Sequence, residues 1–124
     1  MKKIELENAV IENREGVIWI LIKEDADLTE KDIRDFAIAG EKLSGGKPYL
    51  QLTDGRTSLN ITTEGRRAAA KKEVAPLLIA HAILVNNAAV RLIANFFTAI
   101  DKPHFQNKVF NSESDALKWL KQQA

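Results

Sequence analysis

Polar residues with the potential to bind a ligand follow two apolar runs of the chain. Asp54-Gly55-Arg56-Thr57-Ser58 comes after the run Tyr49 to Thr53, and Asn86-Asn87 comes after the run Leu77 to Val85. Free backbone N–H groups at the starts of the helices predicted to follow, together with Arg56, would suit an anion or a phosphorylated side chain. These residues are also the ordinary residues of turns and helix caps, so a purely structural role is the alternative. The candidate ligand or partner surface comprises Asp54, Gly55, Arg56, Ser58, Thr62, Thr63, Asn86 and Asn87.

A second candidate is a group of basic residues, Arg66, Arg67, Lys71 and Lys72. On a helix, Arg67 and Lys71 are four residues apart and would share one face. The group could contact a partner or an anionic surface, or it could form a solvated helix face. No aromatic residue lies among these cations, so stacking on single-stranded nucleic acid is not expected.

The residues that usually carry catalysis or bind metals do not form a recognisable set. His81 lies in an apolar run, which is typical of a core histidine with one hydrogen bond. Two distant histidines and no cysteine do not supply a metal site. Gly45-Gly46-Lys47 follows a predicted helix and precedes a strand, the reverse of the order in a phosphate-binding loop. We therefore expect neither a cofactor nor an enzymatic activity.

Length and composition predict one globular domain over residues 1–124. Of the 124 residues, 45% are hydrophobic and 28% are charged, which excludes a disordered chain. The formal net charge of +1 favours neither nucleic acid nor an acidic membrane as a partner. The N-terminus lacks the apolar segment of a signal peptide, and the apolar runs are too short to span a bilayer. We expect a cytoplasmic protein.

Hydrophobic periodicity predicts the elements that would position these residues. In Ile4 to Asn13 apolar and polar residues alternate, as in a strand with one solvent-exposed face. Val17 to Ile22 is apolar on both faces, as in a central strand. Thr29 is expected to cap a helix whose apolar stripe includes Gly40 and which ends at Ser44-Gly45-Gly46. We expect the missing side chain of Gly40 to allow a close approach to the sheet.

The second half of the chain continues the alternation of strands and helices. After Tyr49 to Thr53, residues 59–61 could form a short extended piece, and a helix capped by Thr62 or Thr63 is expected to run to Pro76. Leu77 to Val85 is predicted as a second buried strand, with a helix as the rival interpretation. A helix over residues 88–100, a short strand over 108–110 and a helix capped by Ser112 complete the chain.

The order β-β-α-β-α-β-α-β-α predicts an α/β domain. Its sheet would be mixed but mostly parallel, with about five strands, four helices packed on it and one antiparallel edge strand.

The helix over residues 88–100 carries two apolar lines. The wider line is expected to be its core stripe and comprises Ala89, Leu92, Ile93, Phe96 and Ile100. A narrower line of Val90, Ala94 and Phe97 lies beside it. Phe97 could therefore mark a homodimer or partner contact, or it could pack beneath the last helix.

The last quarter of the chain, Arg91 to Leu120, resembles the SpoIIAA-like or STAS-like bacterial domains. The shared features are an Ala-Asn-Phe-Phe helix core (residues 94–97), Lys102-Pro103, a short strand ending in Phe110, and a final Ala-Leu-x-Trp-Leu helix (residues 116–120). The order of elements agrees over nearly the whole chain. The resemblance implies a SpoIIAA-like mixed sheet.

That resemblance also implies a function. STAS-like domains are usually non-enzymatic modules that bind regulatory proteins, in some cases under the control of phosphorylation. The phosphorylated residue typically follows Asp at the start of the helix after the third strand, where this chain has Asp54-Gly55. The resemblance therefore does not choose among Ser58, Thr62 and Thr63. A structural similarity to CRAL-TRIO lipid-binding domains makes a small carrier of an apolar ligand the alternative.

Overall fold

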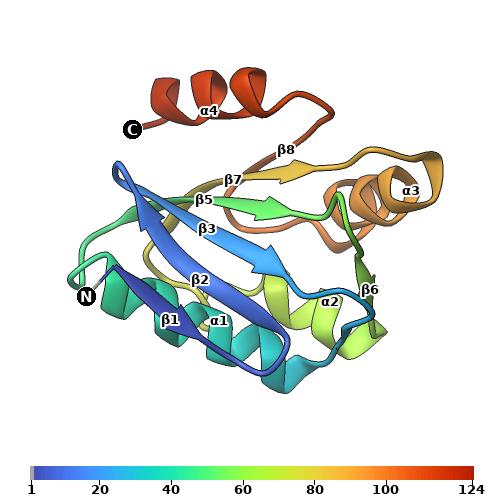
Figure 1. The fold of residues 1–124 in the computed structure, drawn as a ribbon, viewed down its shortest axis with the longest axis horizontal. Coiled ribbons are helices and arrows are strands. Elements are labelled where there is room, and N and C mark those ends of the chain that lie inside the picture. Colours follow the sequence, from blue (N-terminus) through green and yellow to red (C-terminus); the bar gives the residue numbers. More distant parts are fainter. Residues whose placement is uncertain (1) are drawn as a thin grey trace.

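A six-stranded mixed sheet forms the centre of the molecule, and its strands lie in the order β1-β2-β3-β5-β7-β8 (Figure 1). This computed structural model describes residues 2–124. β1, β2 and β3 are antiparallel neighbours, whereas β3, β5, β7 and β8 are parallel. The strands of this sheet are β1 (Lys3–Glu5), β2 (Ala9–Arg14), β3 (Val17–Ile22), β5 (Tyr49–Asp54), β7 (Leu78–Leu84) and β8 (Gln106–Phe110).

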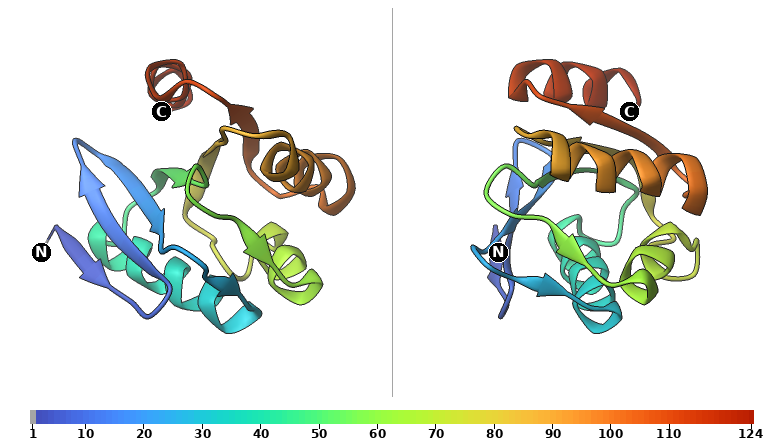
Figure 2. Two further views of the ribbon diagram at one scale, coloured as in Figure 1. Left: turned by 45° about the vertical axis from the view of Figure 1, so that its right-hand side comes forward. Right: turned by 90° about the vertical axis from the view of Figure 1, so that its right-hand side faces the viewer.

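The helices cover both faces of the sheet. Three of them connect successive parallel strands in one direction across the sheet, and right-handed crossovers place all three on one face. The fourth helix follows the last strand and lies on the opposite face from α1 and α2, as Figure 2 shows. The helices are α1 (Glu30–Leu43), α2 (Thr63–Ala70), α3 (Ala88–Phe96), which continues into the π-helical turn η1 (Phe97–Asp101), and α4 (Glu113–Gln122).

The two faces of the sheet build two separate cores. The core under α1, α2 and α3 contains large aliphatic and aromatic side chains, among them Ile20, Phe36 and Phe97. The core under α4 has alanines at its centre: Ala80 and Ala82 of β7 and Ala116 of α4 are completely buried. The expected α/β class is therefore confirmed, with four helices packed on a mixed, mostly parallel sheet.

The antiparallel edge of the sheet contains two strands where the sequence predicted one. The predicted strand Ile4 to Asn13 is interrupted at Leu6, whose N–H donates to the carbonyl of Ala9, so the chain reverses between β1 and β2. A local backbone turn of this kind leaves the alternation of apolar residues nearly intact. β2 then joins β3 through Glu15 and Gly16, both with positive φ, as in the tight turns that hairpins favour.

Two predicted features of α1 are confirmed. Thr29 caps the helix and forms a full capping box, because its side chain accepts the N–H of Asp32 while the carboxylate of Asp32 accepts the N–H of Thr29. Gly40 packs against Tyr49 of β5, and a Cβ atom on Gly40 would lie 3.1 Å from the Tyr49 hydroxyl oxygen. Gly40 is thus needed for the close approach to the sheet.

A two-stranded parallel ribbon connects the starts of α1 and α2. It consists of β4 (Asp27–Leu28) and β6 (Asn60–Ile61). The short extended piece expected over residues 59–61 is therefore present.

Helix α2 is shorter than the sequence predicted. It ends at Ala70, six residues before Pro76, and Lys71 already has an extended backbone. The prediction that Arg67 and Lys71 share a helix face is wrong for this reason. A run of alanines and lysines has high helix propensity, but tertiary contacts beyond residue 70 override it.

Helix α3 turns a different side to the core from the one predicted. Val90, Ala94 and Phe97 are buried, whereas Leu92, Phe96 and Ile100 are exposed. Phe97 contacts the rings of His81 and Phe105, so it is a core residue and not a partner contact. The prediction was wrong because two adjacent apolar lines have the same helical period. Only the packing of the helix on β7 and β8 selects between them.

None of the described helices is both long enough and apolar enough to cross a membrane.

Candidate functional site

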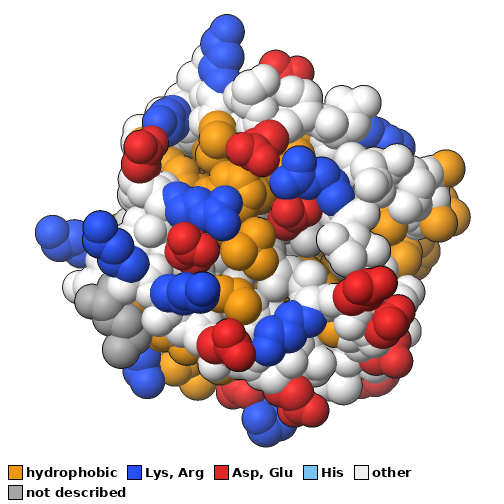
Figure 3. Space-filling model, in the orientation of Figure 1, with side chains coloured by type: hydrophobic (Ala, Val, Ile, Leu, Met, Phe, Trp, Pro, Cys, Tyr) orange, Lys and Arg blue, Asp and Glu red, His pale blue; other side chains and the backbone are white. Residues whose placement is uncertain are grey.

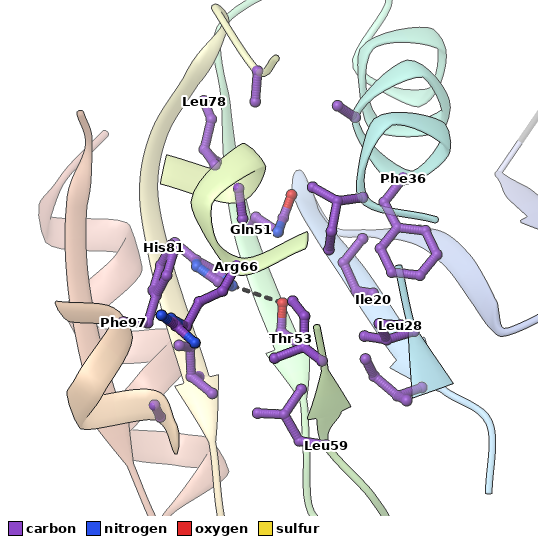
Figure 4. Close-up of a pocket in the computed structure, with 18 of the residues that line it drawn as sticks. Ile20, Leu28, Phe36, Gln51, Thr53, Leu59, Arg66, Leu78, His81 and Phe97 are labelled. Atoms are coloured by element: carbon purple, nitrogen blue, oxygen red, sulfur yellow. Dashed lines mark hydrogen bonds between the residues drawn. The ribbon is translucent and has the colours of Figure 1, made fainter. Parts of the chain in front are cut away.

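A cavity of about 100 Å³ lies between the sheet and the helices α1, α2 and α3 (Figure 4). Its walls are mostly apolar. Phe36 of α1, Ala69 of α2 and Phe97 of η1 come from three helices, and Ile20 and Ile83 come from the sheet. An apolar cavity of roughly 150 Å³ can hold one benzene ring, so this one accommodates roughly four heavy atoms.

Three polar side chains of the sheet interrupt this apolar lining. Gln51 and Thr53 lie two residues apart on β5, so both point to the same face, and His81 pairs with Gln51 from β7. The Thr53 hydroxyl and Nε2 of His81 are hydrogen-bonded at 2.6 Å. Figure 4 shows these side chains pointing toward the cavity from their strands. The cavity therefore has a polar floor.

His81 is electrically neutral at physiological pH. The ring is buried, and the loss of hydration lowers its pKa from 6.5 to about 4. Its Nδ1 and the Oδ1 of Asn107 are buried polar atoms without a regular hydrogen bond, and the two residues pair across β7 and β8. A proton on Nδ1 would point a donor at this neighbouring acceptor. In that tautomer the Thr53 hydroxyl donates to Nε2, and its oxygen lone pairs remain free for a ligand.

Arg66 of α2 lines one side of the cavity and forms an ion pair with Asp101 of η1. The Asp101 side chain is only 4% exposed and that of Arg66 only 17%. The Arg66 guanidinium also stacks on the Phe96 ring, 4.4 Å from its centre. The π-helical turn at residues 97–101 carries Asp101 to this position, and such turns often occur at functional sites.

A surface groove of about 270 Å³ lies on the outer side of Arg66. Leu92 and Phe96 of α3 line it, and Ile61, Arg66 and Ile93 line both the groove and the cavity. Leu92 is 71% exposed and Phe96 is 44% exposed, which is unusual for large apolar side chains. Figure 3 shows apolar side chains at the edge of the molecule where α3 lies in Figure 1. We call Leu92, Phe96 and Ile100 the outer apolar stripe.

The sequence-predicted residues after β5 form an ion cluster. The Asp54 carboxylate accepts two hydrogen bonds from the Arg56 side chain and one from the Arg56 backbone N–H. Partial burial would raise the pKa of Asp54, but its hydrogen bonds with Arg56 and the positive charge outweigh that effect and lower it. Arg56 also contacts Glu113 of α4, 3.3 Å away. Two carboxylates thus compensate the one cation. Gly55 lies beside the end of β7, where its N–H donates to the carbonyl of Leu84.

The remaining predicted residues occupy caps and helix starts. Asn87 caps α3 by accepting the N–H of Val90, and its amide donates to Asn86. Thr62 caps α2 by accepting the N–H of Gly65, and Thr63 is the first residue of that helix. Ser58 lies in the loop before β6 and is partly buried. These residues lie around the carboxyl edge of the sheet but not in the cavity.

The comparison with protein families identifies the chain. A family model described as a domain of unknown function, DUF7793, matches residues 11–124. The chain belongs to this family. The match covers every element from β3 to α4, including all of the residues that line the cavity. No curated protein matches the sequence.

A solved structure confirms the fold of this DUF7793 domain. The chain is similar to an uncharacterized protein of the DUF3478 family with a SpoIIAA-like fold, from Shewanella loihica PV-4. The two chains are 17% identical, the alignment covers 89% of each, and the TM-score is 0.57. The SpoIIAA-like resemblance seen in the sequence is therefore confirmed at the level of the fold.

Sequence reasoning missed most of the cavity. Gln51 was assigned only to a strand, and Arg66 was assigned to an exposed basic group. One signal was available: strict alternation along Tyr49 to Thr53 places Gln51 and Thr53 on one face of a strand that is otherwise buried. Polar residues on the inner face of a central strand indicate either a buried network or a ligand. No comparable signal exists for Arg66, because only the packing of η1 brings Asp101 to it.

Proposed function

We propose that this domain is a non-enzymatic binding module for a small, neutral and mostly apolar molecule. The observation that carries the proposal is the cavity itself, an apolar chamber with convergent polar groups on one side. Ligand pockets in proteins have this construction, with few polar groups that orient the ligand and apolar walls that supply affinity. Of the alternatives that the sequence left open, the carrier or sensor of an apolar ligand fits this geometry best.

The charges around the cavity favour a neutral ligand. His81 is uncharged, and Asp101 compensates Arg66. A carboxylate brought into the cavity would have to compete with Asp101 for Arg66, and burying an unpaired charge is costly. Gln51 offers an amide donor and an amide acceptor, and Thr53 offers a hydroxyl oxygen. An alcohol, a ketone or an amide would match these groups.

The Thr53–His81 pair does not support a catalytic role. A hydroxyl bonded to an imidazole is the arrangement of a nucleophile and its general base. An efficient base, however, has a pKa near the working pH, and that of His81 is about 4. His81 is therefore better suited to fix the orientation of the Thr53 hydroxyl.

Binding of n-butanol tests the proposal, because this alcohol has about the number of heavy atoms that the cavity holds. In ¹⁵N-resolved NMR titrations we expect saturable shifts at residues around Thr53 and Phe97. Ala69→Leu adds three heavy atoms to the cavity wall and should abolish them. Ala89→Leu, on the exposed side of α3, is the matched control and should bind like the wild type. Equal shifts in both variants, or none in the wild-type protein, would exclude the proposal.

A STAS-like regulatory module that acts through protein contacts is the second candidate. The outer apolar stripe favours it, because exposed apolar stripes often mark protein interfaces. Cross-linking in cell extract tests it: a regulatory partner should be captured by the wild type and lost in Leu92→Ser and Ile100→Ser. Capture that is unchanged in these variants would argue against a contact at the stripe. Control by phosphorylation at Ser58, Thr62 or Thr63 and a cytoplasmic location remain predictions.

A further inference from the structure

The cavity is too small to hold a complete ligand of ordinary size. It accommodates roughly four heavy atoms, by comparison with the volume that holds one benzene ring. The groove on the other side of Arg66 is larger, at about 270 Å³, and has an apolar lining of Ile61, Leu92, Ile93 and Phe96. Ile61, Arg66 and Ile93 line both spaces. The two spaces are therefore neighbours along one continuous wall.

We propose that the cavity and the groove form one binding site for an elongated amphiphile, with its neutral polar head in the cavity and its alkyl chain in the groove. This inference rests on the proposed function and specifies its ligand: a single-chain molecule with an uncharged hydroxyl, carbonyl or amide head. The chain passes Arg66 between α2 and α3 and covers Leu92 and Phe96.

The distribution of polar groups determines the direction of the ligand. Gln51, Thr53 and His81 all line the cavity, and none of them lines the groove. An alkyl chain placed in the cavity would leave the amide of Gln51 without a polar partner there, which costs free energy. A polar head in the cavity satisfies it. The alkyl chain then lies on the apolar side chains of the groove, which need no hydrogen-bond partner.

Arg66 is suited to the position between head and chain. Its charged end is held by Asp101 and by the ring of Phe96, so the aliphatic part of the side chain can pack along an alkyl chain. Of the three side-chain nitrogens of Arg66, it is Nε that donates a hydrogen bond to Asp101 among the described residues. Its terminal nitrogens remain as donors to an acceptor group at the junction of cavity and groove.

The outer apolar stripe supports the same assignment. Leu92 and Phe96 are conspicuously exposed, and both line the groove. An alkyl chain in the groove would remove this apolar surface from water. A bound alkyl chain therefore accounts for the exposure of Leu92 and Phe96 in the free domain without a protein partner at this surface.

A series of n-butanol, n-hexanol and n-octanol tests the inference, with dissociation constants taken from NMR titrations. In the wild type we expect the affinity to rise about twofold to fourfold with each added methylene. Leu92→Ser should leave the n-butanol affinity unchanged but reduce the gain between n-butanol and n-octanol by about fivefold. Ile38→Ser is the matched control, because Ile38 is 55% exposed on α1 and lines neither space. It should retain the full gain.

Two further measurements test the direction of the ligand. Nuclear Overhauser effects should connect the carbinol protons of n-octanol with the Thr53 methyl group and its terminal methyl with Leu92. Gln51→Leu, which keeps the size of the side chain, should weaken binding of all three alcohols by a similar factor. A reversed set of contacts, or tighter binding by Gln51→Leu, would overturn the inference.

The remaining outcomes separate the inference from the proposed function. If n-butanol binds in the cavity but Leu92→Ser keeps the full gain with chain length, the groove is not part of the site and only the inference fails. If no alcohol binds, both fail. Sedimentation analysis of the protein without ligand tests a last alternative, a homodimer. If the wild type is a dimer that n-octanol leaves intact and that Leu92→Ser converts to a monomer, a second copy of the chain occupies the groove and the inference fails.

Discussion

The guanidinium of Arg66 lies over the ring of Phe96, with its central carbon 4.4 Å from the ring centre, while its Nε bonds to Asp101. One cation on α2 thus connects two residues of the α3–η1 helix, one exposed and one buried. Arg66 also lines both the cavity and the groove. The ion pair therefore helps to fix α2 against η1 at the place where we propose that the ligand passes.

Asp101→Asn should destabilise the protein by about 3 kcal/mol, because it leaves the mostly buried cation of Arg66 without its counterion. Urea unfolding monitored by circular dichroism measures the change. Asp35→Asn is the matched control: Nζ of Lys31 lies 2.8 Å from Oδ2 of Asp35, but the side chain of Lys31 is 84% exposed. We expect little change there. Equal effects of the two substitutions would contradict the structural role of the Arg66–Asp101 pair.

The stability of the protein should fall between pH 6.5 and pH 4 because of His81. Burial lowers the pKa of the folded-state imidazole to about 4, while the unfolded chain takes up a proton near pH 6.5. Between these values the unfolded state binds more protons, so the stabilisation is fully present above pH 6.5 and is lost as the pH falls toward 4. A difference of this size corresponds to about 3 kcal/mol.

Urea unfolding at a series of pH values measures this loss, and NMR titration of the ring in the wild type measures the pKa directly. The pKa of His104 is also lowered, by burial first of all, so His104→Gln serves as the control that isolates His81. The lowered pKa values of Asp32 and Asp54 act in a more acidic range, below their ordinary value of 3.8. A ring of His81 that titrates near pH 6.5 would contradict the buried neutral state.

Gly65→Ala should destabilise the protein by about 1 kcal/mol or more, although alanine is the better helix former. A Cβ atom at residue 65 would lie 3.1 Å from the backbone carbonyl carbon of Thr29 and 3.1 Å from Cγ1 of Ile61. The backbone of Thr29 is held by its capping box and cannot easily move. Thermal unfolding measures the effect, with the exposed neighbour Glu64→Ala as the control. A stabilised Gly65→Ala protein would show that this contact is loose.

Phosphate should not bind at the Asp54–Arg56 turn of the wild-type protein. Asp54 and Glu113 already compensate Arg56, so an anion gains no free cation there. Replacing both carboxylates, in Asp54→Asn with Glu113→Gln, should create weak binding that salt suppresses. NMR titration with inorganic phosphate measures both cases. Saturable shifts around Arg56 in the wild type would contradict this prediction and would support the anion site that was inferred from the loop residues.

Most elements of the fold could be predicted because their signals are local. The capping residues Thr29, Thr62, Asn87 and Ser112 all cap the helices for which they were proposed. Apolar runs located the central strands. The split of the first strand and the early end of α2 could not be predicted, because each depends on backbone contacts made after folding.

The candidate site was predicted less well. The loop residues of the predicted surface do gather at the carboxyl edge of the sheet, but they bond to one another and to helix ends. His81 was correctly expected to be a core histidine with one hydrogen bond. Its place in a polar floor with Gln51 depends on the pairing of β5 with β7, and no local pattern specifies which residues pair across strands.

The sequence by itself determined the order of the central strands and the four helices and the positions of most helix starts, because these follow from hydrophobic periods and caps within a few residues. The SpoIIAA-like class came from the resemblance of residues 91–120 to that family. Only the tertiary structure decided which apolar line of α3 faces the core, and hence that Leu92 and Phe96 remain outside. It also decided that Arg66 meets Asp101 beside a cavity. Both outcomes depend on the rotation and docking of one helix against distant segments, and the helical period is the same for every rotation.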